Sequence, residues 1–86
     1  MYYVYLLVNG QGKRYVGSAI NINIRLQRHN SGKIHSTKKY LPWTLVYFEA
    51  YATEALARQR EKNLKQHGNA KREMFKRAGI MGKESI

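Results

Sequence analysis

Cysteine is absent from this chain of 86 residues. Its absence excludes a disulfide framework, a thiolate metal site and a cysteine nucleophile, and it fits a reducing compartment. The chain also lacks an apolar run long enough to span a bilayer. The opening segment MYYVYLLV (1–8) has none of the basic residues that begin a signal peptide. We therefore expect a cytoplasmic protein without a membrane segment.

Aspartate is absent as well, so the acidic side chains are few and all glutamates. A two-metal nuclease site needs several converging carboxylates, which this inventory hardly provides. Metal-dependent phosphodiester cleavage by this chain would instead use one metal ion and one glutamate. The glutamates are Glu49, Glu54, Glu61, Glu73 and Glu84.

Positive charge is abundant. Lysine and arginine number 16 against 5 acidic residues, which gives a formal net charge of +11. Such a surface attracts polyanions and speeds encounters with them, so a nucleic acid is the expected partner. A merely solvated basic surface, ribosomal RNA and membrane headgroups remain the alternative explanations.

Three segments have the composition of β-strands. MYYVYLLV (1–8) is apolar on both faces, which is typical of a central strand. The turn NGQG (9–12) joins it to the alternating segment KRYVGSA (13–19), and together they predict a β-hairpin. WTLVYFEAY (43–51) alternates less cleanly, but its high β-propensity indicates a third strand.

Three further segments are predicted to be helical. NINIRLQRHNSG (21–32) begins at the N-cap Asn21 and ends near Gly32, and TEALARQREKNLKQHG (53–68) begins at the N-cap Thr53. NAKREMFKRAG (69–79) predicts a last short helix. The residues expected to pack inward from the last two helices are Leu56, Arg60, Asn63, Leu64, Met74 and Phe75.

The order β-β-α-β-α-α indicates an α+β protein with a small, mostly antiparallel three-stranded sheet flanked by helices. A chain of this length forms one small domain with a modest core. We assign the domain to residues 1–80 and expect residues 81–86 to be a flexible tail.

One set of short motifs is distinctive when taken together. VYL (4–6) and YVG (15–17) lie on the two arms of the hairpin, and RLQRHN (25–30) and RQREKNLK (58–65) follow on helices. From residue 2 to about residue 65 the chain resembles the GIY-YIG nuclease superfamily, most of all its small stand-alone bacterial members. It is also similar to the catalytic domain of structure-selective endonuclease subunits.

The resemblance implies a role for each matching residue. Tyr15 would be the general base that activates water, and Tyr5 would orient that water or the scissile phosphate. Arg25 would hold the phosphate, and His29 would assist nearby. Glu61 would be the sole protein ligand of one divalent ion, Mg²⁺ or Mn²⁺.

The chain departs from the family pattern at several positions. Val4 stands where the first motif has glycine, and Val16 stands where the second has isoleucine. Ser18 occupies a position where some members carry a lysine. Asn69 does not match the spacing of an asparagine that some members carry after the metal ligand.

Simpler explanations exist for the same residues. Glu61 could merely pair with Lys65 on one helix face, and Glu54 is a rival metal ligand. His29 could pack against the hairpin. Trp43 could belong to the core or stack on a base.

The expected function is a metal-dependent endonuclease that hydrolyses DNA in repair or recombination. Its binding is expected to be structure-selective or weakly specific, or a partner protein supplies the targeting. The alternatives are a non-catalytic nucleic-acid-binding protein on the same scaffold and an RNA- or ribosome-associated basic protein. DNA is favoured over RNA, and the oligomeric state is left open. The residues expected to contact nucleic acid are Lys33, His35, Lys38, Lys39 and Lys65.

Overall fold

β1 is the central strand of a sheet whose order is β2-β1-β3, and both pairings are antiparallel. The computed structural model describes residues 1–79. Its three-stranded sheet and its helices confirm the predicted α+β class and element order. The predicted tail (81–86) lies outside the described residues. The elements are β1 (Tyr2–Asn9), β2 (Arg14–Ala19), α1 (Ile22–Asn30), the short 3₁₀ helix η1 (Lys38–Tyr40), β3 (Trp43–Tyr51), α2 (Glu54–Gln66) and α3 (Gly68–Arg77).

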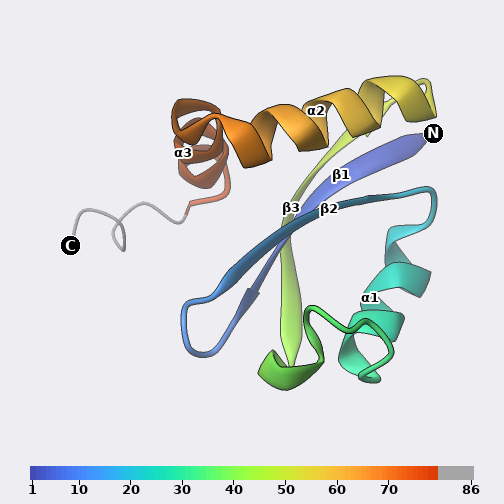
Figure 1. The fold of residues 1–86 in the computed structure, drawn as a ribbon, viewed down its shortest axis with the longest axis vertical. Helices are drawn as coiled ribbons and strands as arrows, with labels where there is room; N and C mark the ends of the chain where they lie inside the picture. The colour runs from blue at the N-terminus through green and yellow to red at the C-terminus, as the bar shows by residue number, and fades with distance from the viewer. Residues whose placement is uncertain (80–86) are drawn as a thin grey trace.

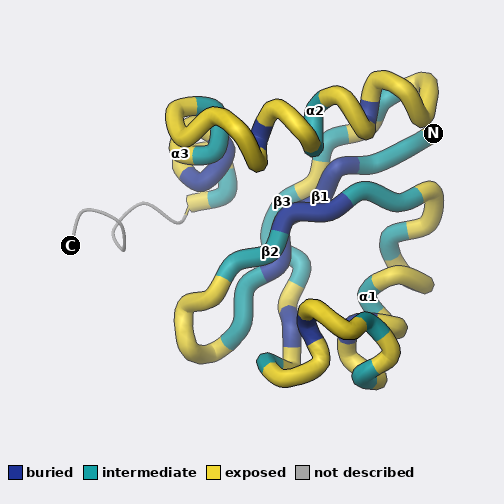
Figure 2. The backbone as a smooth tube through the Cα atoms, viewed as in Figure 1, coloured by how far each residue is buried: buried dark blue, intermediate teal, exposed yellow. Residues whose placement is uncertain are grey.

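The sheet is covered on both sides. Figure 1 shows α2 and α3 on one side of it, and α1 with the loop that follows on the other. This arrangement explains why β1 is apolar on both faces, with Val4 to Leu7 all buried (Figure 2). No helix within residues 1–79 is long and apolar enough to cross a bilayer.

The predicted turn and caps are formed by short polar side chains. The Asn9 side-chain oxygen accepts hydrogen bonds from the backbone N–H groups of Gln11 and Lys13, which closes the hairpin. The Asn21 Oδ1 atom caps α1 at 3.0 Å from the Ile24 nitrogen. The Thr53 Oγ1 atom caps α2 in the same way, so both predicted N-caps are confirmed.

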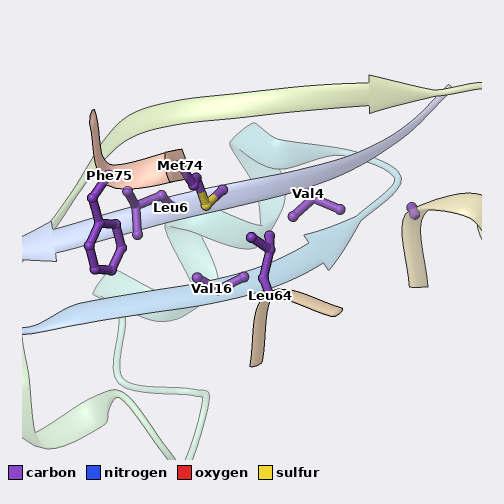
Figure 3. Packing of buried hydrophobic residues seen from close by; sticks show 7 residues of the cluster. Val4, Leu6, Val16, Leu64, Met74 and Phe75 are labelled. Atoms are coloured by element: carbon purple, nitrogen blue, oxygen red, sulfur yellow. The ribbon is translucent and has the colours of Figure 1, made fainter. Parts of the chain in front are cut away.

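Two apolar clusters lie on the two faces of the sheet. Towards α2 and α3, side chains of β1 and β2 pack against Leu64, Met74 and Phe75 (Figure 3). Towards α1, Tyr5 and Leu7 pack with Trp43. Met74 and Phe75 are therefore core residues, as predicted. Of the alternatives open for Trp43, the structure supports a place in the core.

A β-bulge explains the imperfect alternation in β3. The pairing shifts from Leu6–Tyr47 to Leu7–Leu45, so Val46 is an extra residue without a partner in β1. Such a bulge changes which face the following side chains occupy. As a result, Leu45 and Phe48 both lie on the α1 face of the sheet.

The predicted inner face of α2 was partly wrong. Leu56 is 52% exposed, and Asn63 is exposed as well. Ala57 and Leu64, two turns apart on one helix face, make the buried contact instead. The helix thus packs along a narrow line, and residues a third of a turn away from that line reach solvent.

Arg60 joins α2 to the sheet by an ion pair rather than by apolar packing. Its Nε and Nη2 atoms donate to the two oxygens of Glu49 on β3 at 2.8 and 3.0 Å. The hydroxyls of Tyr47 and Tyr51 donate to the same carboxylate. Burial tends to raise the pKa of Glu49, but the hydrogen bonds from Arg60 and the two tyrosines outweigh it and hold the pKa below its usual value. This carboxylate is fully engaged in holding the fold.

Gly17 is required by the close approach of Tyr5. A Cβ atom at Gly17 would lie 2.6 Å from the Tyr5 hydroxyl oxygen and 2.8 Å from its Cζ atom. Tyr5 is buried, and its hydroxyl is held by His29, so the ring cannot move aside. We expect Gly17→Ala to lower the free energy of unfolding by about 1–3 kcal/mol, measured by urea denaturation.

Gly10→Ala is the matched control for this effect, because nothing lies within 4 Å of a Cβ built there. Equal stability losses in the two variants would show that the contact with Tyr5 does not constrain position 17.

Candidate active site

Tyr5, His29 and Thr37 form a buried chain of hydrogen bonds between β1, α1 and the loop before η1. The Tyr5 hydroxyl lies 2.9 Å from His29 Nε2, and His29 Nδ1 lies 2.8 Å from Thr37 Oγ1. Thr37 donates its own proton to the Ile34 carbonyl oxygen. It therefore accepts from Nδ1–H of His29, which leaves Nε2 to accept the Tyr5 proton.

This environment keeps the pair neutral. Burial, with a smaller contribution from the neighbouring Tyr15, raises the pKa of the Tyr5 hydroxyl well above its usual value. Burial, assisted by the positive charge of Arg25, lowers the pKa of His29. Tyr5 thus keeps its proton and His29 stays uncharged at neutral pH.

The ring of Tyr15 packs beside this chain. Its centroid is 5.0 Å from that of His29 and 6.4 Å from that of Tyr5. The Lys65 ammonium lies 5.7 Å from the Tyr15 centroid. Within residues 1–79 the Tyr15 hydroxyl makes no hydrogen bond, and the side chain is only half-buried. It is therefore the tyrosine of this cluster that remains free to contact a substrate.

Glu61 reaches β2 from α2 on the other side of the sheet. Ser18 Oγ donates to Glu61 Oε1 at 2.6 Å, and Lys65 Nζ donates to Oε2 at 2.9 Å. Burial tends to raise the pKa of Glu61, but these two hydrogen bonds and the charges of Lys65 and Arg58 hold it below the usual value. The carboxylate is ionised at neutral pH.

The Glu61 carboxylate fits a divalent cation held by one protein ligand. Mg²⁺ prefers oxygen ligands and commonly takes only one or two carboxylates. Oε1 can accept from Ser18 and still offer a lone pair to an ion, whereas Oε2 accepts from the Lys65 ammonium. No group of three histidine, cysteine, aspartate or glutamate side chains that could hold an ion exists in the described part of the chain. A one-ligand site at Glu61 is the arrangement that the residues present allow.

Arg25 is exposed on α1 and makes no ion pair with any residue that the structure describes. It lines a cleft of about 220 Å³ that runs over the end of β2. Ser18, the hydrogen-bond partner of Glu61, lines the same cleft, as does Arg58. The α2 carboxylate that lines this cleft is Glu54, whereas Glu61 approaches the cleft through its hydrogen bond with Ser18.

The rival ligand Glu54 has a different environment. It lies in the first turn of α2, where it receives hydrogen bonds from Arg58, and its side chain is 53% exposed. An exposed pair of this kind is worth little. Glu61, by contrast, contacts β2 directly.

The predicted nucleic-acid contacts fall into two groups. Lys65 belongs to the cluster around Glu61 and Tyr15. The others lie in the segment between α1 and β3, on the α1 side of the sheet (Figure 1). This second group consists of exposed residues, Lys33, His35, Lys38 and Lys39.

Two residues of the site were not predicted as site residues. Ser18 is predicted only as a departure from the family pattern. It follows Gly17 on β2, and its hydroxyl donates a hydrogen bond to the Glu61 carboxylate. Thr37 was assigned to an exposed loop, but it is 1% exposed, and its carbonyl accepts from Trp43 Nε1. Nothing in a polar, basic segment signals that one threonine is buried.

Comparison with known proteins gives a consistent result. The family model described as the GIY-YIG catalytic domain matches residues 1–74. A UPF0213 protein of Staphylococcus epidermidis RP62A is 38% identical over 65 residues, which cover 74% of this chain and 79% of the relative. A UPF0213 protein of Staphylococcus aureus Mu3 is 35% identical over 72 residues, covering 83% of this chain and 88% of the relative.

A solved structure also resembles the fold. The solution NMR structure of the UPF0213 protein BH0048 from Bacillus halodurans superimposes with a TM-score of 0.52 at 31% identity, over 85% of this chain and 80% of that one. The sequence and the fold therefore indicate the same relatives.

The lowered pKa of His29 predicts a pH-dependent stability. An unfolded histidine binds a proton near pH 6.5, whereas the folded His29 does so only at lower pH. Below about pH 6.5 the unfolded state therefore binds more protons, and stability present above that pH is lost as the pH falls towards the folded pKa. Urea midpoints measured from about pH 7.5 down to about pH 5 should decrease.

His29→Asn should weaken this dependence, whereas His35→Asn, in the exposed loop, should retain it. An NMR titration of the His29 ring in the wild-type protein tests the same point without substitution. A His29 ring that titrates at or above the ordinary histidine pKa would contradict the prediction.

Proposed function

The chain belongs to the GIY-YIG family, a superfamily of nucleases, and from this premise we propose that it is a metal-dependent endonuclease that hydrolyses phosphodiester bonds in DNA. One observation carries the proposal. Tyr15 on β2, Arg25 on α1 and Glu61 on α2 come from three elements that meet around β2: Lys65 joins Glu61 to the Tyr15 ring, and Ser18 joins Glu61 to an open cleft that Arg25 lines. No structural need of the fold accounts for an arginine without an ion pair and a tyrosine hydroxyl without a hydrogen bond among residues 1–79.

Arg25 is suited to hold the scissile phosphate. A guanidinium donates two parallel hydrogen bonds to phosphate oxygens and is always charged. Phosphodiester cleavage increases the negative charge on the non-bridging oxygens, so an arginine in place before the reaction stabilises the transition state more than the ground state. Lys65, next to Glu61, is placed to contribute a second positive charge once a cation occupies the carboxylate.

Tyr15 rather than Tyr5 is supported as the general base. The buried Tyr5 hydroxyl donates to His29 and holds its proton with a raised pKa. The Tyr15 hydroxyl has no partner within residues 1–79, and the Lys65 ammonium lies near its ring. The Tyr15 hydroxyl is therefore the one of the two that can contact an attacking water. In this assignment Tyr5 and His29 position the Tyr15 ring rather than contact the water.

Glu61 would hold one Mg²⁺ or Mn²⁺ ion. When bound, such an ion stabilises the leaving oxygen and offsets the charge on the phosphate. The role of the carboxylate is to present one ionised oxygen ligand, Oε1, which the hydrogen bond from Ser18 orients. In the absence of the ion, the Lys65 ammonium pairs with the other oxygen of the carboxylate, Oε2.

The substrate assignment rests on charge and size. A net charge of +11 on 86 residues favours a polyanion, and the exposed lysines between α1 and β3 can contact its phosphates. So small a domain has little surface for reading bases, and phosphate contacts position a protein without specifying sequence. We therefore favour structure-selective cleavage in repair or recombination, with a partner protein supplying any further targeting.

Replacement of Glu61 by glutamine is the direct test of this reaction. Wild type should cut at least one member of a labelled panel (single strand, duplex, flap, splayed arm, four-way junction and RNA duplex) in Mg²⁺ or Mn²⁺, and EDTA should stop it. Glu61→Gln should reduce cleavage by more than about a hundredfold, since the proposed carboxylate ligand of the ion is removed, while binding measured at fixed salt survives.

Glu73→Gln is the matched control, because Glu73 is exposed on α3, away from the cleft. Cleavage that survives Glu61→Gln but is lost in Glu54→Gln would assign the ion to the rival carboxylate. A wild type that binds but never cuts would favour the non-catalytic binding protein, and preference for the RNA duplex would favour the RNA-associated one.

A pair of phenylalanine substitutions separates the two tyrosines. Tyr15→Phe removes the proposed base and should lower the single-turnover cleavage rate by about 10²–10⁴-fold, the usual contribution of a general base, with little change in stability. Tyr5→Phe leaves His29 Nε2 without its donor and should lower the free energy of unfolding by about 1–3 kcal/mol while keeping more of the rate. The reverse pattern of rates would identify Tyr5 as the base.

A further inference from the structure

A second groove lies on the α1 face of the sheet. It adjoins the cleft that Arg25 and Ser18 line, which we call the catalytic cleft. The groove has a volume of about 370 Å³ and lies between the start of α1 and strands β1 and β3. This volume falls in the lower part of the range of about 300–1,000 Å³ that is typical of small-molecule sites. Ile20 lines both this groove and the catalytic cleft, so the two hollows meet at that residue.

Two aromatic rings form one side of the groove. Tyr3 and Phe48 pack edge to face, with their centroids 5.8 Å apart. Phe48 nevertheless remains 52% exposed. The bulge at Val46 places it there, because without the extra residue Phe48 and Leu45 would lie on opposite faces of the sheet.

Two amide side chains line the other side. Asn21 uses its Oδ1 atom to cap α1, and its side-chain nitrogen makes no hydrogen bond within the described residues. Asn23 is exposed, and its amide is unpartnered within the same residues. An amide offers both donors and an acceptor, which match the edge of a nucleobase.

From these observations we infer that the groove binds an unpaired nucleobase of the DNA strand whose phosphate occupies the adjoining catalytic cleft. The inference rests on the proposed function and names its substrate as DNA with an unpaired base at the cut site. Base faces stack on exposed aromatic rings in single-strand binding sites. A base inside a continuous duplex cannot reach such a ring without leaving its stack.

Charge and composition favour a nucleobase over a protein partner. The net charge of +11 opposes association of two copies of the chain. An apolar protein anchor would cover the rings but would desolvate the amides of Asn21 and Asn23 without pairing them. Arg25, one helical turn from the groove lining, is available to hold the phosphate of the same nucleotide.

The test compares a short oligothymidylate with an abasic strand of equal length, which keeps the phosphates and removes the bases. Binding is measured at fixed salt with the Glu61→Gln protein, so that no cleavage occurs. We expect tighter binding of the oligothymidylate and a roughly tenfold reduction of this preference in Phe48→Leu, the effect of losing one stacked base. Phe48→Trp, which keeps an aromatic surface, should retain the preference.

Leu56→Ala is the matched control, because Leu56 is also 52% exposed but lies on α2, across the sheet. It should leave the ratio of the two affinities unchanged. Thermal unfolding of each variant verifies that the fold is retained.

Equal affinities of the Glu61→Gln protein for the two strands would overturn the inference. So would a ratio of the two affinities that stays unchanged when Phe48→Leu is added. A concentration-dependent dimer that dissociates in Phe48→Leu would also overturn it, since the groove would then be an interface between copies. The binding assay requires no cleavage, so a base preference in a protein that never cuts would contradict the nuclease proposal and leave the base site standing.

Discussion

The buried contact between the Tyr5 hydroxyl and His29 determines the geometry of the α1 side of the sheet. It brings together two residues that are 24 positions apart in the sequence, and it can form only because Gly17 leaves room for the Tyr5 ring. His29 in turn holds Thr37, and the carbonyl of Thr37 accepts the indole proton of Trp43. Together these contacts link β1, β2, α1 and the start of β3.

The position of β2 at the edge of the sheet explains how residues from both layers meet. Its Tyr15 side chain lies on the α1 face, whereas Ser18 points towards α2 and contacts Glu61. Lys65 lies near both Glu61 and Tyr15. If β2 were a central strand, its neighbouring strands would keep the side chains of the two faces apart. At the edge of the sheet, a side chain from one face can reach around β2 to the other. The site therefore requires a short, open β2 as much as it requires the individual residues.

The elements that could be predicted from the sequence are those specified by neighbouring residues. The hairpin turn, the caps Asn21 and Thr53 and the two packing residues Met74 and Phe75 all follow from local patterns. The grouping of Tyr5 with His29 came from resemblance to a family, because no local pattern joins two distant residues. The bulge at Val46 and the exposure of Leu56 depend on how whole elements pack. The burial of Thr37 likewise depends on a histidine from another element.

The distribution of hydrogen bonds separates the side chains of the candidate site that hold the fold from those that remain open to solvent. An unpaired buried polar group costs stability, so such groups are normally satisfied, and within residues 1–79 none is left unpaired. His29 and Glu61 are each engaged by two side chains. Arg25 and the Tyr15 hydroxyl lack protein partners in the same region, and both belong to side chains that solvent reaches. Because water satisfies them in the free protein, they can exchange it for the polar groups of a ligand without disturbing the contacts that maintain the fold.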